Sequence, residues 1–272
     1  MRPRGPAPRR GNRPPLRRLR AEAEVLLRAN AAEPISGVGS MSKPVRWGYR
    51  AYLGGIHGVR RNPVLFRLLF GFKPLSECAP SEGWWDWTTL ALRSVLRRYC
   101  APSTSLLDVG TGPAAALATY AALRLGCQDA WASDHLPWIV EAAQRQTRHL
   151  RAAVHCVCSD LFEAVPRRFD LIVFNAPYLP TQRARSLGLF SAPWAQERFD
   201  GGRDGCSVIS RFLSELAGRL APAGMGALGV NGFHVDRERV ADLIAHSGLD
   251  CAGVLEAPLV RSRVYLLRGH ER

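Results

Sequence analysis

The segment FDLIVFNAPYLP, which starts at Phe169, ends an apolar run with a carboxamide, a proline turn and an aromatic ring. The side-chain oxygen of Asn175 can accept one N–H of a planar amine or amide, and the carbonyl of Ala176 can accept the other. Pro177 restricts Ala176 away from helical geometry and helps to fix that carbonyl. Tyr178 can stack on a flat group. Two acceptors that hold one NH₂ group would point the nitrogen lone pair at an electrophilic methyl group. This is catalysis by orientation and by fixed dipoles. The alternative is a plain Asn-containing turn.

A second candidate site is the glycine-rich segment LLDVGTGPAA, residues 106–115. Gly110 and Gly112 permit a tight turn and close approach of a ligand. Ala115 stands where a dinucleotide fingerprint needs its third glycine, and the segment lacks the lysine of a phosphate-binding loop. Asp108 before the glycines suits a ligand with a positive group. As D-x-G-x-G after the first strand of a βαβ unit, the segment favours S-adenosylmethionine.

Two more acids follow where such a ligand needs them. Asp134 ends the next apolar run and can accept both hydroxyls of a ribose. Asp160 follows the third run, where its carboxylate can accept from an adenine amino group with Leu161 against the ring. An acid of this kind, taken alone, is more often a turn residue or a helix cap than a ligand-binding group. One bridging ligand would explain all three.

The elements that position these residues alternate along the chain. Strands are predicted at 105–109, 130–134, 153–158, 169–175, 225–230, 252–257 and 262–268. Helices are predicted at 86–99, 113–125, 137–149, 205–220 and 235–247, with Pro137 in a first turn and Asp204 as a cap. This order predicts an α/β, Rossmann-like, doubly wound and mostly parallel seven-stranded sheet that ends in a C-terminal antiparallel hairpin. Ligands bind such sheets beyond the carboxyl ends of the strands.

The N-terminal part has a different composition from the rest. Residues 1–40 are rich in Arg and Pro and predict a basic disordered tail, which can bind nucleic acid or anionic lipid but is more often simply solvated. Residues 41–100 predict a small helical extension, and residues 101–272 the ligand-binding domain. Residues 1–50 hold twelve Lys or Arg and three acids, so they carry +9 of the net charge of +14 and the rest of the chain is only mildly basic.

The cysteines show no metal-binding pattern. Seven cysteines without CxxC spacing predict reduced core thiols, no metal site and a cytoplasmic protein. No apolar run has the roughly 20 residues of a membrane span.

Two segments together resemble a known family. SDLFEAVPRRFDLIVFNAPYLP and FDGGRDGCSVISRFLSELAGRLAPAG are similar to the HemK-like protein-glutamine N5-methyltransferases of the class I methyltransferase superfamily. The resemblance covers roughly residues 105–268. It implies that Asp108, Gly110, Gly112, Asp134 and Asp160 bind S-adenosylmethionine. It also implies that Asn175, Ala176, Pro177 and Tyr178 hold the methyl-accepting nitrogen of a protein glutamine, with a translation factor as a candidate partner.

The sequence departs from that family in two places. Ala176 replaces the usual proline of the Asn-Pro-Pro-Tyr tetrapeptide, and PSEGWWDWTT, residues 80–89, replaces the segment that bacterial release-factor enzymes carry before the glycine turn. The tryptophans of this segment either line the site or belong to the core. The long connection after Ala176 offers Arg183, Trp194 and Glu197 either as substrate contacts or, equally, as residues with surface or packing roles.

Other functions stay open at this point. A nucleic-acid amino group such as adenine N6 or a group in ribosomal RNA offers the same NH₂ geometry as glutamine, and a small molecule is a further option. The Ala176 change motivates a non-catalytic S-adenosylmethionine-binding protein. A nicotinamide oxidoreductase is disfavoured by the missing third glycine.

Overall fold

The computed structural model describes most of the chain after its first fifth. The described residues all belong to one compact unit, Ile35–Arg272, and comprise 58–76, 83–186, 189–190, 193–257 and 260–270. The predicted tail and residues 41–57 of the predicted helical extension lie outside them. Within these ranges, no helix combines the length and apolar character needed to cross a membrane.

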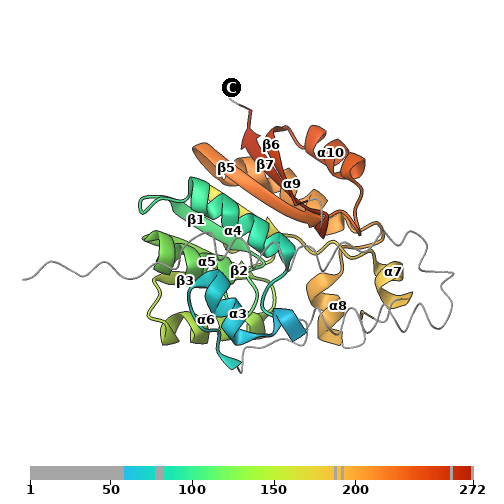
Figure 1. Ribbon diagram of the computed structural model, residues 1–272. Helices are drawn as coiled ribbons and strands as arrows, with labels where there is room; N and C mark the ends of the chain where they lie inside the picture. Colours follow the sequence, from blue (N-terminus) through green and yellow to red (C-terminus); the bar gives the residue numbers. More distant parts are fainter. Residues whose placement is uncertain (1–57, 77–82, 187–188, 191–192, 258–259, 271–272) are drawn as a thin grey trace, which may run out of the picture. The chain divides into compact units, whose positions relative to one another are not determined.

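A single seven-stranded sheet forms the centre of this unit (Figure 1). Its order is β3-β2-β1-β4-β5-β7-β6, with β1 to β5 parallel and β7 antiparallel to both of its neighbours. The strands are β1 (Ser105–Val109), β2 (Asp129–Asp134), β3 (Val154–Cys158), β4 (Phe169–Asn175), β5 (Leu220–Asn231), β6 (Leu249–Ala257) and β7 (Ser262–Gly269). The predicted Rossmann-like sheet and its C-terminal hairpin are confirmed.

Helices pack on both faces of the sheet. On one face α4 crosses the central strands, as Figure 1 shows, and α9 and α10 pack on the other. The helices are α3 (Pro63–Phe70), α4 (Trp87–Tyr99), α5 (Ala116–Tyr120) with a π-helical turn at Ala121–Leu125, α6 (Pro137–His149), α7 (Thr181–Ser186), α8 (Pro193–Phe199), α9 (Ser207–Arg219) and α10 (Arg237–Ala245). Pro137 occupies the first turn of α6, as predicted.

Two sequence predictions about helix starts are wrong. The predicted helix 113–125 begins later, because Ala115 adopts a left-handed conformation with φ 42° and the Asp108 carboxylate accepts the N–H of Ala118. Cys206, and not Asp204, is the residue at the N-cap of α9. The Asp204 carboxylate instead accepts the N–H of Cys206 and pairs with Arg239 on α10.

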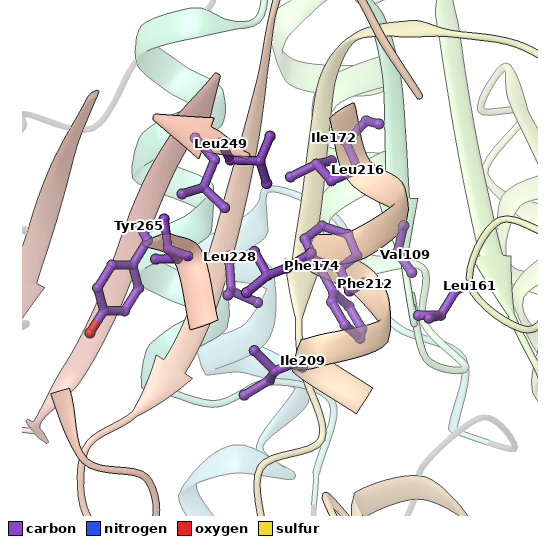
Figure 2. Packing of buried hydrophobic residues seen from close by; sticks show 14 of the residues in the cluster. Val109, Leu161, Ile172, Phe174, Ile209, Phe212, Leu216, Leu228, Leu249 and Tyr265 are labelled. Atoms are coloured by element: carbon purple, nitrogen blue, oxygen red, sulfur yellow. The ribbon is translucent and has the colours of Figure 1, made fainter. Parts of the chain in front are cut away.

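The side chains of β4 alternate between the two cores. Leu171 and Val173 face the core beneath α4, whereas Ile172 and Phe174 face the core beneath α9. Figure 2 shows Phe174 against Phe212 of α9, and their ring centroids are 4.8 Å apart. Burial of each such side chain contributes roughly 1.5–3 kcal/mol. The alternation continues to the end of the strand, so Asn175 projects towards α4.

A glycine on β5 lets α4 approach the sheet closely. A Cβ atom on Gly229 would lie 2.6 Å from Cγ2 of Thr88 and 3.0 Å from Cδ1 of Leu92, both on α4. Gly229 is also the β5 partner of Asn175. The missing side chain therefore brings the start of α4 next to the carboxyl end of β4.

The cysteines only partly match their prediction. The six described cysteines are unpaired, as predicted, but Cys158 and Cys251 are exposed and do not belong to the core. Both lie on strands at the edges of the sheet, β3 and β6, where one flank has no neighbouring strand. The seventh, Cys78, lies outside the described residues.

Candidate active site

Three adjacent parallel strands end in polar side chains at the same edge of the sheet. Asp108 lies near the end of β1, and Asp134 and Asn175 end the flanking strands β2 and β4. The structure therefore brings these predicted site residues to one edge, where ligands of this fold class bind.

The glycine turn after β1 is held by both acids. Thr111 donates its hydroxyl to Asp108 at 2.6 Å, and the N–H of Gly112 donates to Asp134 at 3.1 Å. Gly110 and Gly112 both have positive φ, 61° and 69°, which favours glycine. A Cβ on Gly110 would also approach the Phe174 ring to 3.1 Å. The two glycines are thus required by the backbone itself, independently of any ligand.

Asp108 is a buried acid with a perturbed pKa. Only 2% of its surface is exposed, and burial raises the pKa of its carboxyl to about 7, although bonds from Thr111 and Ala118 oppose this. The nearby Asp134 carboxylate raises it further. Near neutral pH the carboxyl is therefore close to the midpoint of its ionisation, and a bound cation would favour its ionised form.

We expect Asp108→Asn to change how stability depends on pH. The stabilising effect of protonated Asp108 is fully present below its unfolded pKa, near 3.8, and is lost as the pH rises through about 7. Asp108→Asn has no carboxyl that ionises at this position, so it does not lose this stability as the pH rises. Between pH 4 and pH 8 its free energy of unfolding should therefore rise relative to the native protein by more than about 1 kcal/mol, since a pKa difference of one corresponds to about 1.4 kcal/mol. Urea denaturation at both pH values measures it. Asp242→Asn, on the exposed side of α10, is the control and should show no such trend.

The other two acids have different surroundings. Asp134 is 6% exposed, and burial raises the pKa of its carboxyl while the N–H groups of Leu136 and Gly112 oppose that change. Asp160, in contrast, is 44% exposed in its side chain and pairs with Arg211 of α9 at 2.9 Å. Leu161 beside it is buried in the core below α9. Asp134 thus faces the glycine turn directly, whereas the Asp160 carboxylate is engaged with α9.

The side-chain amide of Asn175 is held in one orientation. Its Nδ2 donates to Oδ1 of Asp86 at 3.1 Å and to Oγ1 of Thr89 at 3.2 Å. Its Oδ1 is buried and has no hydrogen-bond partner. An unpaired buried acceptor of this kind costs about 1–3 kcal/mol. A bound ligand at this edge of the sheet is one partner that this oxygen could accept from.

Asp86 connects the start of α4 to the tetrapeptide after β4. Its Oδ1 accepts the backbone N–H and the hydroxyl of Thr89, and its own backbone N–H donates to Oγ1 of Thr89, which completes a capping box. Its Oδ2 accepts the hydroxyl of Tyr178 at 3.0 Å. One carboxylate therefore caps a helix and fixes two residues of the predicted acceptor site, Asn175 and Tyr178.

Tyr178 is fixed on a second side by His234. The two rings stack with centroids 5.7 Å apart and planes 18° apart. Burial and the Asp86 carboxylate raise the pKa of Tyr178 well above its usual range, so its hydroxyl remains a donor. Burial and the charge of Arg183 lower the pKa of His234 to about 4, so its ring is neutral at physiological pH.

The glycine-rich segment after α8 packs behind the tetrapeptide. Ala176 is 4% exposed, and its N–H donates to the carbonyl of Gly229 at 3.2 Å. A Cβ on Gly205 would lie 2.6 Å from the carbonyl oxygen of Tyr178. Pro177 lies between these two fixed points. The glycine is therefore needed for close backbone approach, which explains why GG-x-DG accompanies the tetrapeptide.

Several residues of this edge are absent from the sequence predictions. They are Asp86, Thr89, His234 and Arg198, the last of which lies beside the glycine turn. Asp86 and Thr89 stand three apart at the start of a helical pattern, which is a capping signal. Nothing local in the sequence links that cap to Asn175. The tryptophans beside Asp86 belong to the core beneath α4, where Trp85 is 2% exposed.

Known proteins with similar sequences are methyltransferases by name. The chain is 32% identical over 120 residues to a candidate protein N5-glutamine methyltransferase of Methanocaldococcus jannaschii, covering 44% of this chain and 58% of that protein. It is 32% identical over 123 residues to a release factor glutamine methyltransferase of Bordetella pertussis, covering 44% of each chain. The chain thus spans about half the length of these relatives. No family model matches it.

The fold has solved counterparts. A methyltransferase from Pyrococcus furiosus superposes with a TM-score of 0.52 at 19% identity, covering 82% of this chain and 96% of that one. This similarity confirms the predicted Rossmann-like fold, and the sequence relatives confirm the predicted resemblance. The chain therefore shares the fold of a solved methyltransferase, and its sequence resembles the HemK-like glutamine N5-methyltransferases.

Proposed function

We propose that the protein is an S-adenosylmethionine-dependent N-methyltransferase that methylates the side-chain amide nitrogen of a protein glutamine. One observation carries this proposal above the others. The Asn175 carboxamide is fixed through its nitrogen by Asp86 and Thr89, and its oxygen is buried, unpaired and located at the ligand-binding edge of the sheet.

The arrangement suits a nitrogen nucleophile. An amide NH₂ is a poor nucleophile because its lone pair is delocalised into the carbonyl. Acceptance of its two N–H groups by Asn175 Oδ1 and the Ala176 carbonyl orients that lone pair and stabilises the positive charge that develops on nitrogen. Tyr178, fixed by Asp86 and His234, supplies a flat wall for the planar amide. Orientation and fixed dipoles do this without a strong base.

The neighbouring residues fit the methyl donor. When bound, S-adenosylmethionine supplies an electrophilic methyl group on a positively charged sulfur. Asp134, at the end of β2, would accept from ribose hydroxyls, and Asp108 is an acid whose ionised form a cation would favour. The turn has room for a ligand, because beyond Gly112 and its chain neighbours the nearest described group to a Cβ on Gly112 would be the Arg198 guanidinium, at 3.9 Å. Gly110, Asp160 and Leu161 complete the proposed cofactor site.

The names of the relatives suggest the substrate class. The Bordetella pertussis relative is named for release factors and the Methanocaldococcus jannaschii relative for protein glutamine. We therefore propose a glutamine in an exposed loop of a translation factor as the acceptor. The unpaired state of the described cysteines is consistent with a cytoplasmic site of action.

A second candidate acceptor is an amino group of nucleic acid. Adenine N6 presents the same planar NH₂, and the net charge of +14 favours binding of phosphates. The stacked pair of Tyr178 and His234 would suit a flat base. Glutamine remains the first choice because the sequence relatives carry that name.

The test is methyl transfer in a lysate. The full chain is incubated with S-adenosylmethionine labelled with tritium in its methyl group, and the products are treated with protease or with nuclease. We expect label that protease releases, and acid hydrolysis of the labelled protein should convert it to volatile methylamine, the product expected from an N-methylated amide. Boiled protein is the control.

Each other outcome has a defined meaning. Label released by nuclease would transfer the proposal to the nucleic-acid acceptor. Protein label that stays non-volatile after hydrolysis would indicate a different side chain. Binding of S-adenosylmethionine without any transfer would support the non-catalytic binding protein.

A further inference from the structure

Arg198 lies directly over the glycine turn. Its Nη2 atom is 3.9 Å from the position that a Cβ on Gly112 would occupy. Apart from Gly112 and its two chain neighbours, no other described residue comes within 4 Å of that position. Arg198 belongs to α8, in the long connection that follows the acceptor tetrapeptide. A cationic side chain therefore lies where the ligand must approach the turn.

The position of Arg198 is fixed by the fold of this connection. The carbonyl of Phe199 accepts the N–H of Leu179 at 3.2 Å, and the carbonyl of Leu179 accepts the N–H of Gly201 at 2.9 Å. Thr181 donates its hydroxyl to the Asp200 carboxylate at 2.6 Å. The end of α8 is thus tied to the residues just after Tyr178. Arg198 also packs over the Phe199 ring at 4.7 Å, which restricts its motion.

The charge of Arg198 acts on the same carboxylate that holds the turn. It is one of the charges that favour the ionised form of Asp134, together with His135. The Asp134 carboxylate accepts the N–H of Gly112 at 3.1 Å, so cation, acid and turn form one cluster. Among these groups, Arg198 is the one suited to bind an anion.

The proposed cofactor has a single anionic group. S-adenosylmethionine carries a positive sulfonium, a positive ammonium and one carboxylate, while its ribose and adenine are neutral. A guanidinium beside the bound ligand would repel both cations, and its planar fork matches a carboxylate. We propose that Arg198 binds the carboxylate of the methionine part, an inference that rests on the proposed function.

Arg198 connects the proposed cofactor site to the proposed acceptor site. Arg198 is held through Phe199 and Leu179 to the tetrapeptide that orients the acceptor nitrogen. Binding of the carboxylate therefore stabilises α8 and, through it, the connection that follows Tyr178. Arg198 is then a cofactor-binding residue that couples the donor site to the acceptor site.

The experiment compares two ligands that differ only in the carboxylate. Isothermal calorimetry measures binding of S-adenosylmethionine and of decarboxylated S-adenosylmethionine to the full chain. We expect the native protein to prefer the carboxylate form by about 10- to 100-fold, the range of a charge-assisted pair. Arg198→Gln should lose this preference by weakening only the carboxylate form. Arg203→Gln removes an exposed charge from the same connection and should keep the preference.

The outcomes separate the inference from the proposed function. If Arg198→Gln binds the cofactor and still discriminates as the native protein does, the inference is wrong and the proposed function is unaffected. If the native protein binds neither compound, the proposed cofactor is wrong and the inference is overturned with it. Should the Gln variant be unstable in thermal denaturation, Arg198→Lys serves the same comparison and should show a reduced preference, because lysine lacks the fork.

Discussion

Replacement of Asn175 by alanine is expected to reduce methyl transfer by about 10³-fold, because it removes a buried acceptor aimed at the reacting nitrogen. The affinity for S-adenosylmethionine should stay within about threefold of the native value. The Asn175 side chain is held by Asp86 and Thr89, and not by Asp108, Asp134 or the glycine turn of the proposed cofactor site. Turnover with labelled cofactor gives the first quantity, and calorimetry gives the second.

A matched control lies at the end of the next strand. Asn231 ends β5, where its oxygen accepts the N–H of Phe233 and its nitrogen donates to the carbonyl of Val260. Asn231→Ala removes an equal number of atoms and should leave the rate of transfer close to native. A rate for Asn175→Ala within tenfold of that control would refute the assignment of the acceptor site.

Replacement of Asn175 by aspartate separates the presence of an acceptor oxygen at this position from its orientation. Asn175→Asp keeps the oxygen acceptors but lacks the NH₂ group that Asp86 and Thr89 hold. Two carboxylates would then face each other, and like charges at this distance repel strongly in a partly buried site. We expect this variant to be as inactive as the alanine variant, which would show that the orientation of the oxygen matters and not its presence alone.

Much of the fold is visible in local sequence patterns. All seven strands lie within a few residues of their predicted positions because each is a short apolar run bounded by turn residues. Asn175 is recognisable as a candidate site residue because it is a polar residue at the end of such an apolar run. The predicted helix start at residue 113 is the exception, and its physical cause is not visible in the hydrophobic periodicity of the sequence. The Asp108 carboxylate and the left-handed Ala115 delay the start of α5.

The unpredicted part of the site consists of contacts between distant segments. Asp86 and Asn175 are 89 positions apart in sequence, and they meet because Gly229 on a third element lets α4 approach β5. Arg198 reaches Gly112 only through the folded connection after β4. Each of these side chains has an ordinary local explanation, as a helix cap or a surface charge. Only the tertiary fold gives them a second role.

Replacement of Asp86 by alanine is expected to lower the rate of transfer by about 10²-fold, the scale of misplacement by a supporting residue. Asp86 does not accept the substrate in our proposal, and acts by positioning Asn175 and Tyr178. The loss should therefore appear mainly in kcat, while the affinity for S-adenosylmethionine stays near native. Because Asp86 also caps α4, the variant should lose about 1–2 kcal/mol of stability as well.

Helix α3, which also begins at a side-chain cap, provides the control that separates these two effects. Asn62 caps α3 by accepting the N–H groups of Val64 and Leu65, and it has no part in the proposed site. Asn62→Ala should cost about 1 kcal/mol of stability, as measured by urea denaturation, with no loss of rate. If both cap variants lowered kcat in proportion to their loss of stability, Asp86 would be only a structural residue. Asp86→Asn, which keeps one oxygen for the cap and lacks the second carboxylate oxygen that Tyr178 uses, should fall between the native protein and the alanine variant.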